Sequence, residues 1–335
     1  MRLINLFIFL LSFQLHAGVF SQPFEKPSVD AVISYAMTVE EMDRSVEFYT
    51  NVLTFTKVAD FYVSGSAYDK LYNLDNVRIR VVRLRLGQET LNLMQFDKPK
   101  GRKVPVNAES NDRMFQHIAI VVSNIDSAYA KLLKNGVVNI SPSPQKLPEW
   151  NHNVAGIEAF YFKDPDGHPL EIIHFPPGKG NPRWQEALGL LFLGIDHSAI
   201  VVKSTNKSLA FYHSLLGLDV MGKSFNYGPE QEKLNNVKGA KLRITSLHAE
   251  KGPGIELLEY VSPSTGADMP SDTKPNDLWH WQIRLQAPRI SDLYKSLVQA
   301  NMATHGILTF TNPYLDYHEA FLTADPDGHA LLITR

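Results

Sequence analysis

The chain has 335 residues, more than one hydrophobic core usually serves, so we expect two domains of about 150 residues each. Its formal net charge of −2 argues against the basic surface with which proteins bind nucleic acids or anionic membranes. The absence of cysteine excludes disulfides, thiolate ligands and cysteine nucleophiles, so any metal must be bound by imidazole or oxygen.

Residues 1–21 are typical of a signal peptide. A basic start at Met1-Arg2 precedes a mostly apolar run, Leu3–Leu15, and small residues follow, with cleavage after Ala17 or Ser21 both compatible. The apolar run is shorter than the roughly 20 residues that span a bilayer. We therefore expect export to a periplasm or the cell exterior, with no integral membrane span in the mature chain. An uncleaved anchor or a disordered tail is the alternative.

From Val29 onward the sequence divides into four modules that match in alternation. The first and third share a helical pattern, Arg44–Tyr49 against Lys207–Tyr212, and the second and fourth share the motif Asp-Pro-Asp-Gly-His, at 164–168 and 325–329. An internal duplication explains this alternation. We predict an α+β protein with two domains, 29–176 and 193–335, separated by a Pro/Gly-rich linker at 177–192 that includes a short helix over 183–190.

Each module is predicted to form a strand, a helix and then several strands. Apolar spacing and helix-stop residues place the predicted helices near Met42–Leu53, Ser123–Asn135, Thr205–Leu216 and Ser291–Val298. Alternating runs after each helix predict strands. The two Asp-Pro-Asp-Gly segments are interpreted as hairpin turns, because proline fixes φ and glycine tolerates positive φ.

Two histidines occupy nearly identical strand patterns, His117 in Gln-His-Ile-Ala-Ile-Val-Val and His197 in Asp-His-Ser-Ala-Ile-Val-Val. Each is followed, further along the chain, by a glutamate in an apolar run: Glu171, then Glu256. Taken singly, each residue has a structural explanation, such as a satisfied core histidine or a glutamate that faces solvent. Burying an unpaired carboxylate is costly, so the repeated order indicates a shared divalent cation. Two imidazoles and two carboxylates suit Zn, Ni, Co, Fe or Mn.

These residues resemble the vicinal-oxygen-chelate superfamily, which includes glyoxalase I, methylmalonyl-CoA epimerase, extradiol dioxygenases and bleomycin-resistance proteins. The resemblance covers 29–335 and is carried by the four βαβββ-like modules, the Ser-x-x-Phe-Tyr helices and the Asp-Pro-Asp-Gly turns. It implies that modules pair into two open barrels with the metal inside, bound by the first and last strands of each module. A monomer is then plausible, because the modules can pair within one chain.

Carried over by position, the resemblance implies that His117, Glu171, His197 and Glu256 are the metal ligands. The corresponding positions in the first and fourth modules are occupied by Ser34, Asn92, Gln282 and Leu332. If the second module pairs with the third, and the first with the fourth, one barrel receives all four ligands and the other almost none. We therefore predict this crossed pairing.

The resemblance implies a metal-dependent lyase or isomerase of glyoxalase I type, acting on a small carbonyl compound by proton transfer at a metal-bound enediolate. Glu171 would be the catalytic base, with Glu256 as second choice. Two alternatives stay open: an extradiol-type or other dioxygenase, which Gln282 and Leu332 argue against, and a non-catalytic small-molecule-binding protein. The segments 150–153 and 225–228 are expected to be loops that border the pocket. Arg284 could bind an anion in the second barrel, although a structural role is favoured.

Overall fold

The computed structural model describes residues 28–186, 189–302 and 306–335. The first module contains β1 (Ala31–Thr38), α1 (Met42–Glu47), the π-helix η1 (Phe48–Val52), β2 (Thr56–Ser64), α2 (Ser66–Tyr72), β3 (Arg78–Leu86) and β4 (Glu89–Phe96). The second contains β5 (Phe115–Val122), α3 (Ile125–Lys134), β6 (Val138–Asn139), β7 (Gln145–Lys146), β8 (Glu158–Lys163) and β9 (Pro169–His174).

A short 3₁₀-helix, η2 (Pro182–Gln185), follows the second module. The third module contains β10 (Phe192–Val201), α4 (Thr205–Leu209), the π-helix η3 (Ala210–Leu215), β11 (Asp219–Tyr227), α5 (Pro229–Asn235), β12 (Lys241–His248) and β13 (Gly254–Ser262). The fourth contains β14 (Trp281–Gln286), α6 (Ile290–Gln299), β15 (Leu308–Thr309), β16 (Glu319–Ala324) and β17 (Ala330–Thr334). No helix within the described residues is long and apolar enough to cross a membrane.

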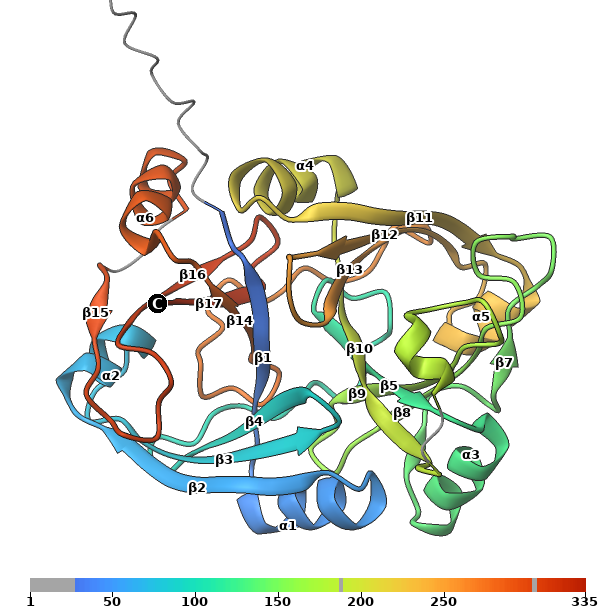
Figure 1. The fold of residues 1–335 in the computed structure, drawn as a ribbon, viewed down its shortest axis with the longest axis horizontal. Coiled ribbons are helices and arrows are strands. Elements are labelled where there is room, and N and C mark those ends of the chain that lie inside the picture. The colour runs from blue at the N-terminus through green and yellow to red at the C-terminus, as the bar shows by residue number, and fades with distance from the viewer. Residues whose placement is uncertain (1–27, 187–188, 303–305) are drawn as a thin grey trace, which may run out of the picture.

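The strands form two curled sheets that lie side by side (Figure 1). One has the order β15-β16-β17-β14-β1-β4-β3-β2 and the other β11-β12-β13-β10-β5-β9-β8-β6. Strands of the first and fourth modules therefore share one sheet, joined by the antiparallel β1–β14 pair, and those of the second and third share the other, joined by β5–β10. The predicted α+β architecture and the predicted crossed pairing are confirmed. Below, the two sheets are called the 1–4 barrel and the 2–3 barrel.

The strand register confirms which positions correspond in the two barrels. In the 2–3 barrel, Glu171 pairs with Ala119 and Glu256 with Ala199, each two residues beyond a histidine. In the 1–4 barrel, Asn92 pairs with Ala36, two residues beyond Ser34, and Leu332 pairs with Arg284, two residues beyond Gln282. The duplicated barrel thus carries Ser34, Asn92, Gln282 and Leu332 at the four places, as the sequence indicated.

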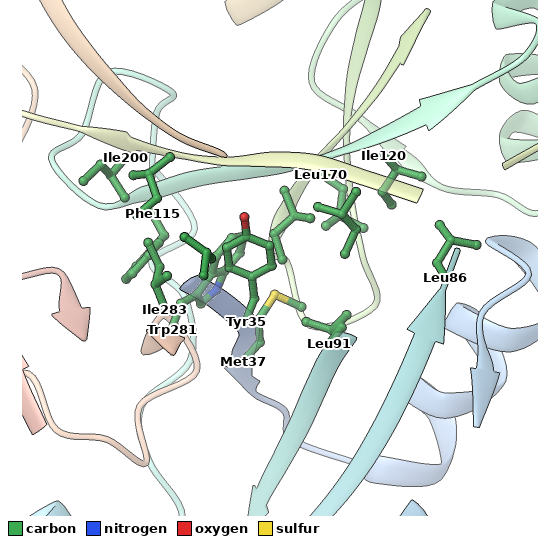
Figure 2. Close-up of a cluster of buried hydrophobic side chains, with 14 of the residues drawn as sticks. Tyr35, Met37, Leu86, Leu91, Phe115, Ile120, Leu170, Ile200, Trp281 and Ile283 are labelled. Carbon is green, nitrogen blue, oxygen red and sulfur yellow. The ribbon is translucent and has the colours of Figure 1, made fainter. Parts of the chain in front are cut away.

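A shared apolar core joins the two barrels. Figure 2 shows part of it, with Tyr35, Met37, Leu91, Trp281 and Ile283 of the 1–4 barrel against Phe115, Ile120, Leu170 and Ile200 of the 2–3 barrel. These side chains are almost fully buried. The hydroxyl of Tyr35 also donates to the carbonyl of Gly254, at 3.0 Å, across the interface. One hydrophobic core therefore holds the two barrels in a fixed arrangement.

The two Asp-Pro-Asp-Gly-His segments form tight turns before β9 and β17, as predicted, and also connect one barrel to the other. Tyr49 of η1 donates to Asp164 at 3.0 Å, and Tyr212 of η3 donates to Asp325 at 3.2 Å. Each aspartate is also 2.8–2.9 Å from the Nδ1 of the histidine that ends its motif, His168 or His329. The turns thus attach modules of different sheets through buried polar contacts.

Two local predictions differ from the structure, and the structure does not test a third. The predicted helix over 183–190 is shorter, because the described 3₁₀-helix ends at Gln185. Residues Phe225–Tyr227 belong to strand β11 and are not a loop, since their backbone groups pair with β12. The predicted signal peptide, 1–21, lies outside the described residues.

Candidate metal centre

Four strands of the 2–3 barrel bring the four predicted residues into one cavity of about 550 Å³. His117 comes from β5, Glu171 from β9, His197 from β10 and Glu256 from β13. The His117 Nε2 atom lies 3.0 Å from Glu171 Oε2 and 3.2 Å from His197 Nε2, which is 3.8 Å from Glu171 Oε2. His197 Nε2 is 3.4 Å from Glu256 Oε2. The tertiary structure therefore brings together residues that are far apart in sequence.

Glu256 stands slightly apart from the other three residues. The ligand atoms of His117, Glu171 and His197 all lie within 4.8 Å of one another, and Glu256 does not belong to this tight group. Its side chain is 22% exposed, against 5% for Glu171, and its Oε1 atom accepts a hydrogen bond from Ser246 Oγ at 2.6 Å. The two glutamates are thus chemically distinct.

Two β-bulges supply hydrogen-bond partners for the histidines. In the antiparallel β5–β10 pair, Asp196 is the extra residue between the pairs formed by Ile195 and His197. Likewise, Gln116 is the extra residue beside His117. A bulge re-aims a side chain that would otherwise point to the opposite face of the sheet. Asp196 Oδ2 therefore lies 2.9 Å from His197 Nδ1, and Gln116 Oε1 contacts His117 Nδ1.

These contacts orient the Nε2 atoms of both imidazoles toward the same point in the cavity. Because Asp196 and Gln116 present oxygen acceptors to Nδ1, each histidine carries its proton there and keeps a lone pair on Nε2. In these neutral tautomers the two Nε2 lone pairs face each other and the Glu171 carboxylate, at 3.0–3.8 Å. This arrangement is repulsive unless a proton or a cation lies between the three groups. The donor set fits a divalent cation bound by imidazole and carboxylate.

The electrostatics of His197 agree with a need for positive charge. Burial lowers the pKa of His197, but the carboxylates of Glu256, Asp196 and Glu171 outweigh it and raise the pKa to about 9. Burial also acts to raise the pKa of Asp196, yet its hydrogen bond with His197 holds that pKa below the usual value. Trp184 Nε1 donates to the second oxygen of Asp196 at 2.7 Å, which fixes this carboxylate.

Sequence reasoning missed Asp196 and Gln116 as supporting residues. Side chains alternate between faces in a regular strand, so a residue adjacent to a ligand is expected on the opposite face. Only the bulges overturn that expectation, and nothing in the sequence marks them. The single available signal was that each histidine follows a residue whose side chain carries an oxygen acceptor.

Asp164, Asp166 and His168 form a second cluster of potential metal ligands, but the atoms that could bind a metal already interact with other groups of the protein. Asp164 accepts from Tyr49 and from the backbone N–H groups of Asp166 and His168. Asp166 pairs with Arg44 and accepts from Ser45 at 2.8 Å. These groups fix the turn against α1, which supports the structural interpretation of the motif.

Among the described residues of the 1–4 barrel, no comparable group of histidine and carboxylate side chains comes together. Its cavity measures only about 50 Å³. Asn92 donates to Ser34 Oγ at 3.2 Å. Arg284 pairs with Asp316, donates to Thr334 and stacks on Tyr317. Its charge is therefore already balanced by a protein carboxylate, as a structural role requires.

Comparison with known proteins decides the family. A sequence model described as "Glyoxalase/Bleomycin resistance protein/Dioxygenase superfamily" matches residues 31–172 and 194–333, which together form most of the chain. The chain belongs to this superfamily. Members of the superfamily with solved structures share the fold. Glyoxalase I from Zea mays has a TM-score of 0.56 at 13% identity, over 91% of this chain and 92% of that chain.

Two further comparisons are informative. A putative dioxygenase from Bacillus subtilis subsp. subtilis str. 168 has a TM-score of 0.56 at 14% identity, over 92% of this chain and 86% of that chain. A 2-epi-5-epi-valiolone epimerase from Actinomyces sp is 31% identical over 159 residues, which are 45% of this chain and 83% of the epimerase. The solved structures establish the fold alone, because one superfamily fold hosts several chemistries.

Proposed function

We propose that the chain is a metal-dependent isomerase or lyase that moves a proton at the carbon next to a substrate carbonyl group. One observation carries the proposal: two imidazole Nε2 atoms and a buried carboxylate converge at 3.0–3.8 Å inside a large cavity. The similarity to an epimerase, which inverts a stereocentre, and the fold shared with glyoxalase I support this class of reaction. The glyoxalase I reaction itself is one possible member of the class.

His117, His197 and Glu171 would hold the divalent cation, with Glu256 completing the set when the carboxylate turns inward. When bound, such a cation stabilises negative charge on a carbonyl oxygen and so makes the adjacent C–H bond more acidic. The metal is one of Zn, Ni, Co, Fe or Mn, since imidazole and carboxylate ligands suit all five.

Glu256 is the better candidate for the proton-transferring base, although sequence reasoning ranked Glu171 first. Glu171 Oε2 lies near both histidines and its side chain is almost fully buried, so it is suited to a permanent ligand. Glu256 faces the cavity, and Ser246 binds only its Oε1 atom. The other oxygen, Oε2, lies 3.4 Å from His197 Nε2 at the edge of the tight group, where it would accept a proton from the substrate and return it, which is the task of a general base.

The test combines metal analysis with proton exchange. We would measure the bound metal and the rate at which deuterium from D₂O enters the carbon beside the carbonyl of candidate substrates. His117→Ala, His197→Ala and Glu171→Ala should lower both quantities. Glu256→Gln should retain most of the metal and lose at least about 100-fold in exchange rate, the usual contribution of a general base.

The 1–4 barrel offers matched controls. Gln282→Ala and Asn92→Ala change the positions that correspond to His117 and Glu256, and should leave metal content and exchange unaltered. A wild-type protein that retains no divalent metal, or a metal-loaded protein that exchanges no carbonyl compound, would contradict the proposal.

A further inference from the structure

The two barrels serve as an internal comparison for the wall of the cavity. In each, a nine-residue strand, β2 or β11, is followed by one glycine with positive φ and a seven-residue helix, α2 or α5. The positions therefore correspond one to one. Where the 1–4 barrel has Phe61, Val63 and Tyr68 lining its small cavity, the 2–3 barrel has Ser224, Asn226 and Gln231 lining its large one.

This exchange replaces apolar and aromatic side chains by neutral hydrogen-bonding groups beside the metal centre. Asn226 and Gln231 are 4% and 2% exposed, and Asn226 donates to Gln231 Oε1 at 3.0 Å. Asn151, from the loop before β8, donates to Asn226 Oδ1 at 2.8 Å. Gln231 Nε2 in turn donates to Asn235 Oδ1. Each amide has two N–H donors and an oxygen with two lone pairs, so beyond these bonds both retain capacity to bind a ligand.

The rest of the lining limits the ligand further. The second module contributes mostly apolar side chains, among them Leu147, Val154 and Ile173. The cavity therefore combines an apolar wall with a wall of amides and a hydroxyl group. A ring or short chain with C–H groups on one side and hydroxyl groups on the other matches both walls. Its C–H groups can pack against the apolar wall, and its hydroxyl groups can form hydrogen bonds with the polar wall.

The charged lining residues are engaged with the protein. Arg183 pairs with Glu89 at 2.8 Å and stacks on Trp184, and Lys179 donates to the carbonyl of His152. Asp196 is bound to His197. Among the described lysines and arginines that line the cavity, this leaves Lys223, which is exposed on the edge strand β11. No buried lysine or arginine is thus presented to a carboxylate or phosphate in the way that Arg forks usually are.

We propose that the substrate is an uncharged, polyhydroxylated carbonyl compound whose hydroxyl groups bind Ser224, Asn226 and Gln231. This inference rests on the proposed proton-transfer function and adds the substrate class. It excludes anionic thiol conjugates as the preferred substrate, because Arg183 and Lys179 are engaged within the protein and no buried lysine or arginine among the described lining residues is free to balance their charges.

The experiment uses the full metal-loaded protein and three named probes. They are an inosose, which is a neutral cyclic polyhydroxyketone; cyclohexanone, which has the same ring without hydroxyl groups; and the hemithioacetal of methylglyoxal and glutathione, which is anionic. Binding would be measured by saturation-transfer NMR, and exchange by deuterium incorporation. We expect the inosose to exchange at least about 100-fold faster than cyclohexanone, since sites built for hydroxyl groups reject analogues that lack them.

Variants connect the preference to the proposed residues. Gln231→Leu and Ser224→Ala should weaken inosose binding about 10-fold or more and leave cyclohexanone unchanged. The matched control is Tyr68→Phe, since Tyr68 occupies the position of Gln231 in the 1–4 barrel. This variant should change neither inosose binding nor cyclohexanone binding. If circular dichroism shows that Gln231→Leu does not fold, the effect of Ser224→Ala on inosose binding decides the test.

The outcomes separate the two proposals. Binding of the inosose that is sensitive to these variants but occurs without exchange would support the substrate class and count against proton transfer. Preference for the hemithioacetal, especially if lost in Lys223→Ala, would overturn the substrate class and leave proton transfer intact. Failure of the inosose to bind at all would also overturn the substrate class.

Discussion

Replacing Asp196 by asparagine should weaken metal binding without removing any metal ligand. Trp184 Nε1 donates to Asp196 Oδ1, so an asparagine would keep its carbonyl oxygen toward Trp184 and turn its NH₂ group toward His197 Nδ1. An N–H donor at this point forces the imidazole proton onto Nε2, the atom that must bind the cation.

The magnitude follows from what binding would then require. Either the asparagine rotates and loses the hydrogen bond from Trp184, at a cost of about 0.5–1.5 kcal/mol, or His197 binds in the wrong tautomer. Loss of the negative charge adds to this cost. Removal of such supporting partners typically weakens metal binding about 10- to 100-fold, or about 1.4–2.8 kcal/mol. The pKa of His197 in metal-free protein should also fall, because Asp196 helps to raise it.

The affinity would be measured by competition with a chromogenic chelator, and the pKa of His197 by NMR titration. Asp164→Asn is the control, because Asp164 makes a comparable buried contact, 2.8 Å from His168 Nδ1, outside the cavity. It should lower stability and leave the metal affinity unchanged. An Asp196→Asn protein with wild-type affinity and an unchanged His197 pKa would refute the assigned tautomer.

Three further predictions concern stability and processing. Tyr49→Phe removes the hydroxyl donor to buried Asp164 and should cost about 1–3 kcal/mol in urea unfolding, more than the exposed Tyr314→Phe. Burial lowers the pKa of His168, but Asp164 outweighs it and raises the pKa to about 9. The pKa of His168 in the folded protein exceeds its unfolded value of about 6.5, so the ion pair stabilises the fold fully below about pH 6.5 and loses this effect as pH rises through about 9. Equal urea midpoints for wild type and Asp164→Asn at pH 7 would contradict this prediction. Export predicts a mature N-terminus after Ala17 or Ser21, which N-terminal sequencing of the protein from its native host can check.

Much of the architecture was readable from the sequence because duplication leaves a periodic record. The repeated helices and turns gave four modules, and the unequal distribution of His and Glu between them favoured the pairing that the sheets adopt. The end of the helix predicted to stop at Asn135 was also local, because the chain turns away at Gly136 with positive φ. Its start was predicted one residue early, at Ser123, since Asn124 is the residue that caps α3 by accepting from Ser127 N–H. Side chains of this kind act within a few residues of their own position.

Features that depend on contacts between distant segments were not predictable in the same way. The Asp-Pro-Asp-Gly-His segments were correctly predicted as turns, but their aspartates also bind tyrosines of other modules. The end of β11 was expected to be a loop, yet its backbone pairs with β12. Local propensity describes how a segment bends, whereas the partner of a buried polar group depends on which segments pack against it.

By itself, the sequence determined the duplicated α+β fold and the four residues most suited to a cation, because hydrophobic periodicity and repetition are local properties of a chain. The tertiary structure decided that Glu171 lies in the tight group with both histidines while Glu256 stands apart beside Ser246. It also decided that Asp196 and Gln116 point toward the histidines, since a bulge arises only from the register between two paired strands. Distances of a few ångströms between residues far apart in the chain are set by packing, and packing involves every module at once.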